Sequence, residues 1–261
     1  MPELPEVERA RSLIEALALG RRIVAVDDSD TYVCRPFAPG EIAAALIGRE
    51  LTAAHRVGKS MWVETDGGGG PALGLHLGMA GRIVVDDEAA GDPKPDGERP
   101  SAAWDRFTLR FADGGRLVLR DKRRLGRAVL DPDLSGLGPD AAEIGRDAFR
   151  ERVGRGSAPA KARIMDQAVI AGVGNLLADE VLWRARLDPR RAAGDLDDEE
   201  LDRLRRELRA AIRSAIRRGG AHTGDVISAR ARGARCPRCG TEMARATVAG
   251  RTTYWCPAEQ V

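Results

Sequence analysis

The spacing of apolar residues changes along this chain, and the change limits what it can fold into. From residue 21 to residue 130, apolar and polar residues alternate in stretches with the period of two that is typical of half-buried strands. After the turn-rich linker 131–139 the spacing becomes helical, and the final forty residues return to short strands around three cysteines. The pattern therefore predicts an α+β protein of several domains: a β-rich part, a helical part and a C-terminal β-hairpin.

The expected strands lie in four segments of the first half, which are residues 21–26, 50–65, 71–85 and 104–130. Asp113-Gly114-Gly115 indicates a hairpin turn in the last segment. Residues 86–101 are rich in Asp, Gly and Pro, and we expect them to form a flexible surface loop.

Two helices are indicated most clearly. The first is expected to begin at Pro5, because proline suits the first helical position, and to stop near Gly20. The second lies within 196–220, where Asp197 and Glu200 resemble a capping box and Gly219 ends the helix. Leucine and isoleucine recur on one face of this second helix, at positions 201, 204, 208, 212 and 216.

The net charge of +2 says little, but the distribution of charge says more. Residues 120–127 hold five basic side chains and one acidic side chain, and residues 221–261 carry six arginines against three acids. Such clusters are typical of phosphate-binding surfaces, although a solvated face in an arginine-rich chain is the alternative. No apolar run is long enough for a membrane span and no signal peptide is evident, so we expect a cytosolic protein.

Three of the four cysteines lie close together near the C-terminus. Cys236-x-x-Cys239 followed by Cys256 has the spacing of a metal site rather than of a disulfide framework. Cys34 stands alone and is expected to be a small buried apolar residue.

Pro2 and Glu3 precede the first helix. Removal of Met1 would leave proline as a terminal secondary amine. The pKa of an α-amino group is about 8, against about 10.4 for the lysine side chain. Such an amine can attack an aldehyde-type carbon to give an iminium ion, and Glu3 beside it can transfer protons. The alternative is that both residues merely precede a helix. Taken alone, this stretch favours that alternative.

Two glycine-rich stretches change the balance. HLGMAG (76–81) carries a methionine on a tight turn, and AGVGNLLADE (171–180) places small residues before Asn175, so that a backbone can approach closely. A core methionine and a simple turn between helices are the plainer readings.

Seven motifs taken in order resemble the formamidopyrimidine-DNA glycosylase / endonuclease VIII family. They are PELPEVE at the N-terminus, GKS around Lys59, HLGMAG, KRRLG (122–126), KxxxMD (161–166), GVGN and a cysteine hairpin that ends in Gln260. The match is collinear from residue 2 to residue 260, and PELPEVE is the form of the formamidopyrimidine branch.

The resemblance implies roles for individual residues. Pro2 would attack C1′ of the damaged nucleotide, with Glu3 as general acid and base, and Lys59 would grip phosphates at the reacting centre. The phosphates and the lesion side would be contacted by Asn175, Arg251 and Lys161. The space left by a flipped base would be filled by Met79, Arg123 and Leu125.

The resemblance also implies an architecture, a cofactor and a partner. A β-sandwich domain with flanking helices would occupy residues 1–131, a helix–two-turns–helix domain 132–225 and a zinc-finger-like hairpin 226–261. Cys236, Cys239 and Cys256 would bind one Zn²⁺, and the partner would be double-stranded DNA with a damaged base or abasic site. The protein is expected to act as a monomer.

Three positions depart from the family pattern. Glu259 stands where the family has the cysteine that is the fourth zinc ligand, and structural zinc sites prefer thiolate and imidazole. Glu259 or a water would then complete the site, with His222 as a remote alternative. Leu125 stands where the formamidopyrimidine branch usually has phenylalanine, so the preference for the opposite base is open. The segment 221–235 looks too short for the lid that closes over 8-oxoguanine, so the lesion is open as well.

The expected function is that of a bifunctional glycosylase, which excises oxidised bases and cuts the strand by β,δ-elimination. A damaged-DNA-binding or lyase-only protein that has lost efficient base excision is the alternative. A transcription factor built on a zinc hairpin would explain neither Pro2 nor GVGN.

Overall fold

The computed structural model describes residues 2–91 and 101–261, and they form two compact units. The first unit consists of Pro2 and Glu6–Ser135, and the second of Glu3–Pro5 and Gly136–Val261. The expected boundary at 131/132 lies close to the one between Ser135 and Gly136, and the C-terminal hairpin belongs to the second unit.

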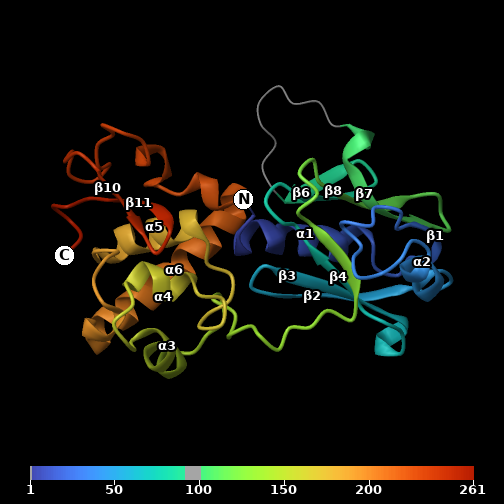
Figure 1. The fold of residues 1–261 in the computed structure, drawn as a ribbon, viewed down its shortest axis with the longest axis horizontal. Coiled ribbons are helices and arrows are strands. Elements are labelled where there is room, and N and C mark those ends of the chain that lie inside the picture. The colour runs from blue at the N-terminus through green and yellow to red at the C-terminus, as the bar shows by residue number, and fades with distance from the viewer. Residues whose placement is uncertain (1, 92–100) are drawn as a thin grey trace. The chain divides into compact units, whose positions relative to one another are not determined.

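The first unit holds two antiparallel sheets (Figure 1). The five-stranded sheet has the order β1-β7-β8-β5-β6, and the four-stranded sheet has the order β2-β3-β4-β9. The strands are β1 (Ile23–Asp27), β2 (Leu51–Val57), β3 (Ser60–Thr65), β4 (Leu73–His76), β5 (Arg82–Val85), β6 (Glu88–Gly91), β7 (Asp105–Phe111), β8 (Arg116–Arg120) and β9 (Arg127–Leu130).

One apolar core joins the two sheets. Leu75 of β4 and Phe107 of β7 come from different sheets and are buried in the same cluster. Ile14 of helix α1 (Leu4–Leu17) joins them, and so does Cys34, which confirms its expected place as a small buried residue. Alternation of apolar residues along the strands has thus produced the predicted sandwich with a flanking helix, and a short helix α2 (Glu41–Leu46) completes the unit.

Two local expectations are corrected by the structure. Helix α1 begins at Leu4, one residue before Pro5, and the Leu4 N–H donates to the carbonyl of Gly172 at 3.1 Å. Residues 88–91 were expected to be loop but form strand β6, because they pair with β5. The rest of that expected loop, residues 92–100, lies outside the described residues.

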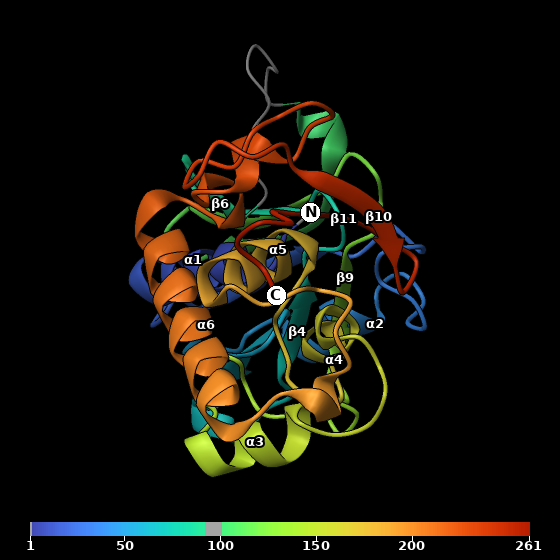
Figure 2. The same ribbon diagram turned by 90° about the vertical axis from the view of Figure 1, so that its left-hand side faces the viewer.

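The second unit is helical, as predicted. Its helices are α3 (Arg146–Val153), α4 (Ala160–Met165), α5 (Asn175–Ala185) and α6 (Asp198–Arg218). Helix α6 begins with the predicted capping box of Asp197 and Glu200 and ends at Gly219, whose φ of 109° favours glycine. Figure 2 shows α6 beside α5, and the apolar face of α6 is buried in the core of this unit.

The chain ends in a hairpin of β10 (Ala244–Val248) and β11 (Arg251–Trp255), which packs on α5 (Figure 2). Its turn residues, Ala249 and Gly250, both have positive φ, as a two-residue hairpin turn requires. Short 3₁₀ turns lie at Asp66–Gly68, Ala102–Trp104, Ala193–Asp195, Ala221–Thr223 and Ile227–Ala229. Within residues 2–91 and 101–261, every helix is too short or too polar to cross a bilayer.

Candidate active site and metal centre

Glu3 lies at the N-terminus of helix α5. Its carboxylate accepts three backbone N–H groups: Oε1 accepts from Leu176 at 2.8 Å, and Oε2 accepts from Gly174 and Leu177 at 3.0 Å each. The side chain is 1% exposed. The first N–H groups of a helix have no partner within it and carry partial positive charge. The helix end therefore holds the buried carboxylate in one position.

Gly174 is needed for this contact. A Cβ at this position would overlap the carboxyl group of Glu3, so any other residue would push the two apart. Its backbone is extended, with φ −119° and ψ −166°, so close approach and not strain explains the glycine. The GVGN motif thus brings the start of α5 against Glu3. Pro2 is bonded directly to Glu3, so fixing the carboxylate also limits where the proline can lie.

Asn175 opens helix α5 and faces the hairpin. Its Nδ2 donates to the carbonyl oxygen of Thr252 at 3.2 Å, while its Oδ1 is buried without a hydrogen-bond partner among the described residues. Thr252 follows Arg251, the first residue of β11, whose side chain is exposed. The second unit therefore brings together Glu3, Asn175 and Arg251, three of the predicted site residues.

Lys161 of helix α4 is also in the second unit, but it is buried. Its Nζ lies 2.6 Å from Asp179 Oδ1 and donates to Thr253 Oγ1 at 2.8 Å. The side chain is 1% exposed. The sequence indicated a role for Lys161 near DNA, and the structure encloses its ammonium group with protein partners.

The first unit brings together the residues expected to fill the duplex. The HLGMAG and KRRLG turns touch, because a Cβ on Gly78 would overlap the backbone of Leu125. Met79 is 39% exposed and Arg123 is exposed, whereas Leu125 is partly buried. Exposed apolar and basic side chains on two packed turns fit a surface that enters DNA.

Asp121 holds the KRRLG turn in shape, and the sequence reasoning missed it. Its fully buried carboxylate accepts the backbone N–H of Arg123 at 2.9 Å and those of Leu125 and Gly126 at 2.7 Å each. The signal was available, because Asp121 is the one acid in the basic stretch 120–127 and aspartate often bonds backbone N–H groups two residues ahead. Asp121 shapes the KRRLG turn.

Lys59 lies in the turn between β2 and β3, next to Gly58 with φ 58°. The pKa of His76 lies below 6.5. Burial is the larger cause, and the positive charge of Lys59 lowers the pKa further. His76 is the first residue of HLGMAG, and its Nδ1 accepts the N–H of Gly78 at 3.0 Å. Lys59 therefore shares the neighbourhood of the Met79 turn.

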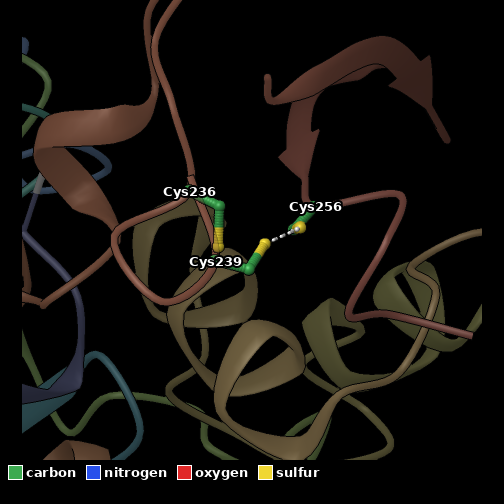
Figure 3. A group of neighbouring side chains, drawn as sticks. All are labelled: Cys236, Cys239 and Cys256. Carbon is green, nitrogen blue, oxygen red and sulfur yellow. Dashed lines mark hydrogen bonds between the residues drawn. The ribbon is translucent and has the colours of Figure 1, made fainter. Parts of the chain in front are cut away.

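The three C-terminal cysteines form a candidate metal centre (Figure 3). The sulfur atoms of Cys236, Cys239 and Cys256 lie within 4.8 Å of one another, and the Cys239 and Cys256 sulfurs are 3.5 Å apart. Three thiolates fit three positions of a tetrahedral zinc site. Among the described residues, this group contains no fourth ligand. Glu259 is instead directed to arginine, with Oε2 3.2 Å from Arg238 Nη1.

The cysteines differ in acidity. Burial acts to raise the pKa of Cys236, but the indole N–H of Trp183 and nearby backbone N–H groups outweigh it and lower the pKa to about 7. Burial raises the pKa of Cys256 to about 11. Metal ligation requires thiolates, so binding at this centre would release protons.

Gln260 holds the C-terminal segment through two hydrogen bonds of its own. Its side chain is buried, accepts the N–H of Cys256 at 2.8 Å and donates to the carbonyl of Leu187 at 2.9 Å. The family motif had placed Gln260 at the end of the hairpin, but its two bonds could not be predicted.

The arrangement agrees with comparisons to known proteins. The formamidopyrimidine-DNA glycosylase N-terminal domain matches residues 1–128, and the H2TH domain of the same enzymes matches residues 135–226. The formamidopyrimidine-DNA glycosylases of Roseiflexus sp. and Chloroflexus aurantiacus are 37% and 34% identical, over 98% and 100% of this chain and 98% of each relative.

Solved structures give the same result. Lactococcus lactis Fpg in complex with DNA containing an abasic site has a TM-score of 0.82 and 26% identity, with 99% of both chains covered. The same enzyme with DNA containing Fapy-dG has a TM-score of 0.82 and 28% identity, again over 99% of both chains. This chain belongs to the formamidopyrimidine-DNA glycosylase family.

Proposed function

We propose that this protein excises oxidised bases from double-stranded DNA and then cuts the strand at the abasic site, with Pro2 as nucleophile. The observation that carries the proposal is the Glu3 carboxylate, held by three N–H groups at the start of α5 and bonded through the chain to Pro2. A buried carboxylate beside a terminal amine supplies both a proton carrier and a nucleophile. We propose that the protein acts as a monomer.

The chemistry begins after Met1 is removed, because only then is the Pro2 nitrogen an amine. The nitrogen attacks C1′, the bond from C1′ to the base breaks, and the base leaves with a proton. Glu3 transfers a proton to the ring oxygen as the deoxyribose opens, which leaves an iminium ion between Pro2 and C1′. Because the base is gone and the sugar is open, this intermediate is the same as that formed from an abasic site.

The iminium ion then allows the strand to be cut. It withdraws electrons from C2′, so loss of a C2′ proton breaks the C3′–oxygen bond to the phosphate. Loss of a C4′ proton next breaks the C5′–oxygen bond, and water hydrolyses the remaining imine to return the Pro2 amine. Glu3 can take up and return protons in these steps, because its position is fixed.

Lys59, Asn175 and Arg251 are proposed to hold the phosphates around the damaged nucleotide. The exposed guanidinium of Arg251 suits charge-assisted bonds to phosphate, and the Asn175 amide has a second N–H donor besides the one that it gives to Thr252. Flipping a base out of the duplex costs a few kcal/mol of lost stacking. We propose that Met79, Arg123 and Leu125 enter the duplex at this step and offset that cost.

The metal proposed for the cysteine group is one Zn²⁺. Cys236, Cys239 and Cys256 would hold it, and the ion would cross-link the segment before β10 to the residue after β11. Glu259 remains paired with Arg238 in this proposal, so a solvent molecule is the fourth ligand.

One observation favours the lyase-only or damage-binding alternative. The segment 221–235 is already committed to packing, since Val226 and Ala229 are buried in the hairpin core and the Arg230 guanidinium pairs with Asp179. A segment held in this way is poorly suited to closing over a flipped purine. The protein can thus keep the lyase step while 8-oxoguanine is excised poorly.

Borohydride trapping tests the nucleophile. The native protein should form a covalent adduct with abasic-site DNA, and peptide mapping should find the DNA on the N-terminal peptide. A variant with extra residues before Pro2 should give no adduct, because its proline nitrogen is an amide. An adduct on a lysine instead would remove Pro2 from the mechanism.

Glu3→Gln and a panel of lesion duplexes separate the two functions. Gln keeps the shape but cannot carry the proton, so base excision should fall by about 10²-fold or more, while cutting of preformed abasic sites should fall less. If no lesion in the panel is excised by the native protein but abasic DNA is cut, the lyase-only alternative is correct.

A further inference from the structure

A buried ion cluster lies between helix α5 and the hairpin. The carboxylate of Asp179 is fully buried on α5, with Oδ1 2.6 Å from Lys161 Nζ and Oδ2 2.7 Å from Arg230 Nε. Asn175 and Asp179 are four residues apart on α5 and so share one face, and both reach β11. Asp179 Oδ2 accepts the backbone N–H of Tyr254 at 3.4 Å.

From this cluster a chain of hydrogen bonds leads to Arg251. Lys161 Nζ donates to Thr253 Oγ1 at 2.8 Å, and the same hydroxyl donates to the carbonyl oxygen of Arg251 at 3.0 Å. Thr253 is fully buried, whereas the Arg251 side chain is exposed. The backbone of the exposed arginine is therefore tied to a buried charge through one hydroxyl group.

The ammonium group of Lys161 is enclosed by protein partners. Its Nζ donates to Thr253 Oγ1 at 2.8 Å and to the carbonyl of Thr252 at 3.4 Å, and it forms an ion pair with Asp179 Oδ1 at 2.6 Å. Moving this buried charge toward a phosphate would leave the Asp179 carboxylate short of one partner, which is costly in a buried site. Lys161 is built to bind the hairpin.

We propose that Lys161 is a positioning residue, which sets Arg251 for phosphate binding through Asp179 and Thr253. The proposal rests on the proposed function, in which Arg251 grips DNA. None of the bonds in this chain involves a cysteine sulfur. The anchor therefore works whether or not the cysteine group holds a metal, and it suits a chain in which Glu259 replaces the fourth thiol ligand.

A double-mutant cycle tests the proposal. Thr253→Val keeps the volume and removes the hydroxyl, Thr253→Ser keeps the hydroxyl, and Arg251→Ala removes the phosphate contact. Thr247→Val is the matched control, because Thr247 is an exposed threonine of β10 paired with Thr252 on the same hairpin. Affinity is measured for a duplex with a stable abasic-site analogue over a range of salt concentrations.

Thr253→Val should weaken binding by about tenfold, as expected for loss of a hydrogen bond to a charged group. It should also reduce the slope of log affinity against log salt by about one phosphate contact, as Arg251→Ala should. The double variant should bind no worse than Arg251→Ala alone, because both changes remove the same contact. Thr253→Ser and Thr247→Val should bind like the native protein.

Several results would overturn the proposal. If the double variant shows the product of the affinity losses of Thr253→Val and Arg251→Ala, the hydroxyl does not act through Arg251. If Thr253→Val binds normally, the relay has no role. Failure of Thr253→Val to fold, seen as a loss of cooperative melting, shifts the test to Lys161→Met, which keeps the alkyl chain and removes the charge, in the same cycle.

Hydrogen exchange on the native protein adds a test that needs no variant. The amides of β11 should remain protected after treatment with a zinc chelator, whereas opening of the hairpin on chelation would refute metal-independent anchoring. Borohydride trapping of the native protein reports on the proposed function separately. If borohydride traps the native protein on DNA but the double-mutant cycle gives one of the contrary results above, only the positioning role is disproved.

Discussion

The α-carbon of Gly174 lies directly against the carboxyl group of Glu3, with no room for a methyl group between them. A single contact therefore couples the start of helix α5 to the residue that is proposed to move protons. It also explains in physical terms why a glycine precedes Asn175 in GVGN.

Gly174→Ala should displace the Glu3 carboxylate and break its bonds to the N–H groups of Leu176 and Leu177. A shift of about 1 Å at a reacting group costs about 10²-fold in rate, so single-turnover base excision should fall by that order. Gly136→Ala is the control, because nothing lies within 4 Å of its Cβ. Equal activity of Gly174→Ala and the native protein would mean that Glu3 does not need this position.

Much of the fold could be predicted from the sequence because the relevant signals are local. The period of two gave the strands, and the capping box with Gly219 gave both ends of α6. Strand β6 was missed because residues 86–91 look like a turn, and only their pairing with β5 makes them a strand. Pairing of this kind is a tertiary property.

The site was predicted less completely, for a related reason. Motifs gave the residues that would meet DNA, such as Pro2, Asn175 and Arg251, but not the residues that hold them. Asp179 acts through Lys161 and Arg230, which are distant from it in sequence, whereas Asp121 bonds close neighbours in its own turn and was overlooked although its signal was local. The burial of Lys161 could not be foreseen, because a lysine in a DNA-binding motif is ordinarily exposed.

Asp121→Asn should destabilise the KRRLG turn. Asparagine offers one acceptor oxygen without charge, whereas the buried aspartate accepts N–H groups from Arg123, Leu125 and Gly126. We expect a loss of about 1–3 kcal/mol in the free energy of unfolding, measured by urea titration, and weaker binding to abasic-site DNA. Asp133→Asn changes a similar but exposed turn at Ser135 and should cost much less. Equal losses for the two variants would argue against a special role of Asp121.

The stability of the first unit should depend on the protonation of His76. Burial lowers the pKa of His76 below 6.5, and the charge of Lys59 lowers it further, so the folded state favours the neutral ring that accepts the Gly78 N–H. Between the folded-state pKa and 6.5 the unfolded chain binds more protons, so stability rises with pH. The contribution is complete above pH 6.5 and is lost as the pH falls through the folded-state pKa.

His76→Asn provides the measurement, since an amide oxygen can accept the Gly78 N–H without titrating in this range. The free energy of unfolding is measured from about pH 4.5 to about pH 7.5, a range that includes the ordinary histidine pKa. In this variant, the part of its pH dependence that comes from His76 should be absent. His55→Asn changes a half-exposed histidine on β2 and should retain that slope. A native protein with flat stability across this range would contradict the assignment.

Glu259→Cys should complete the metal centre. The position follows Cys256 by three residues, and its carboxylate is now paired with Arg238, so a thiol there adds a fourth soft ligand and removes a competing ion pair. Zinc affinity, measured by competition with a chromophoric chelator, should rise by about tenfold or more, because structural sites strongly prefer thiolate. Glu259→Gln removes the charge without adding a ligand and should leave the affinity close to that of the native protein. A large loss of zinc affinity in Glu259→Gln would show that the native carboxylate leaves Arg238 and binds the metal. Glu259, and not a solvent molecule, would then be the fourth ligand.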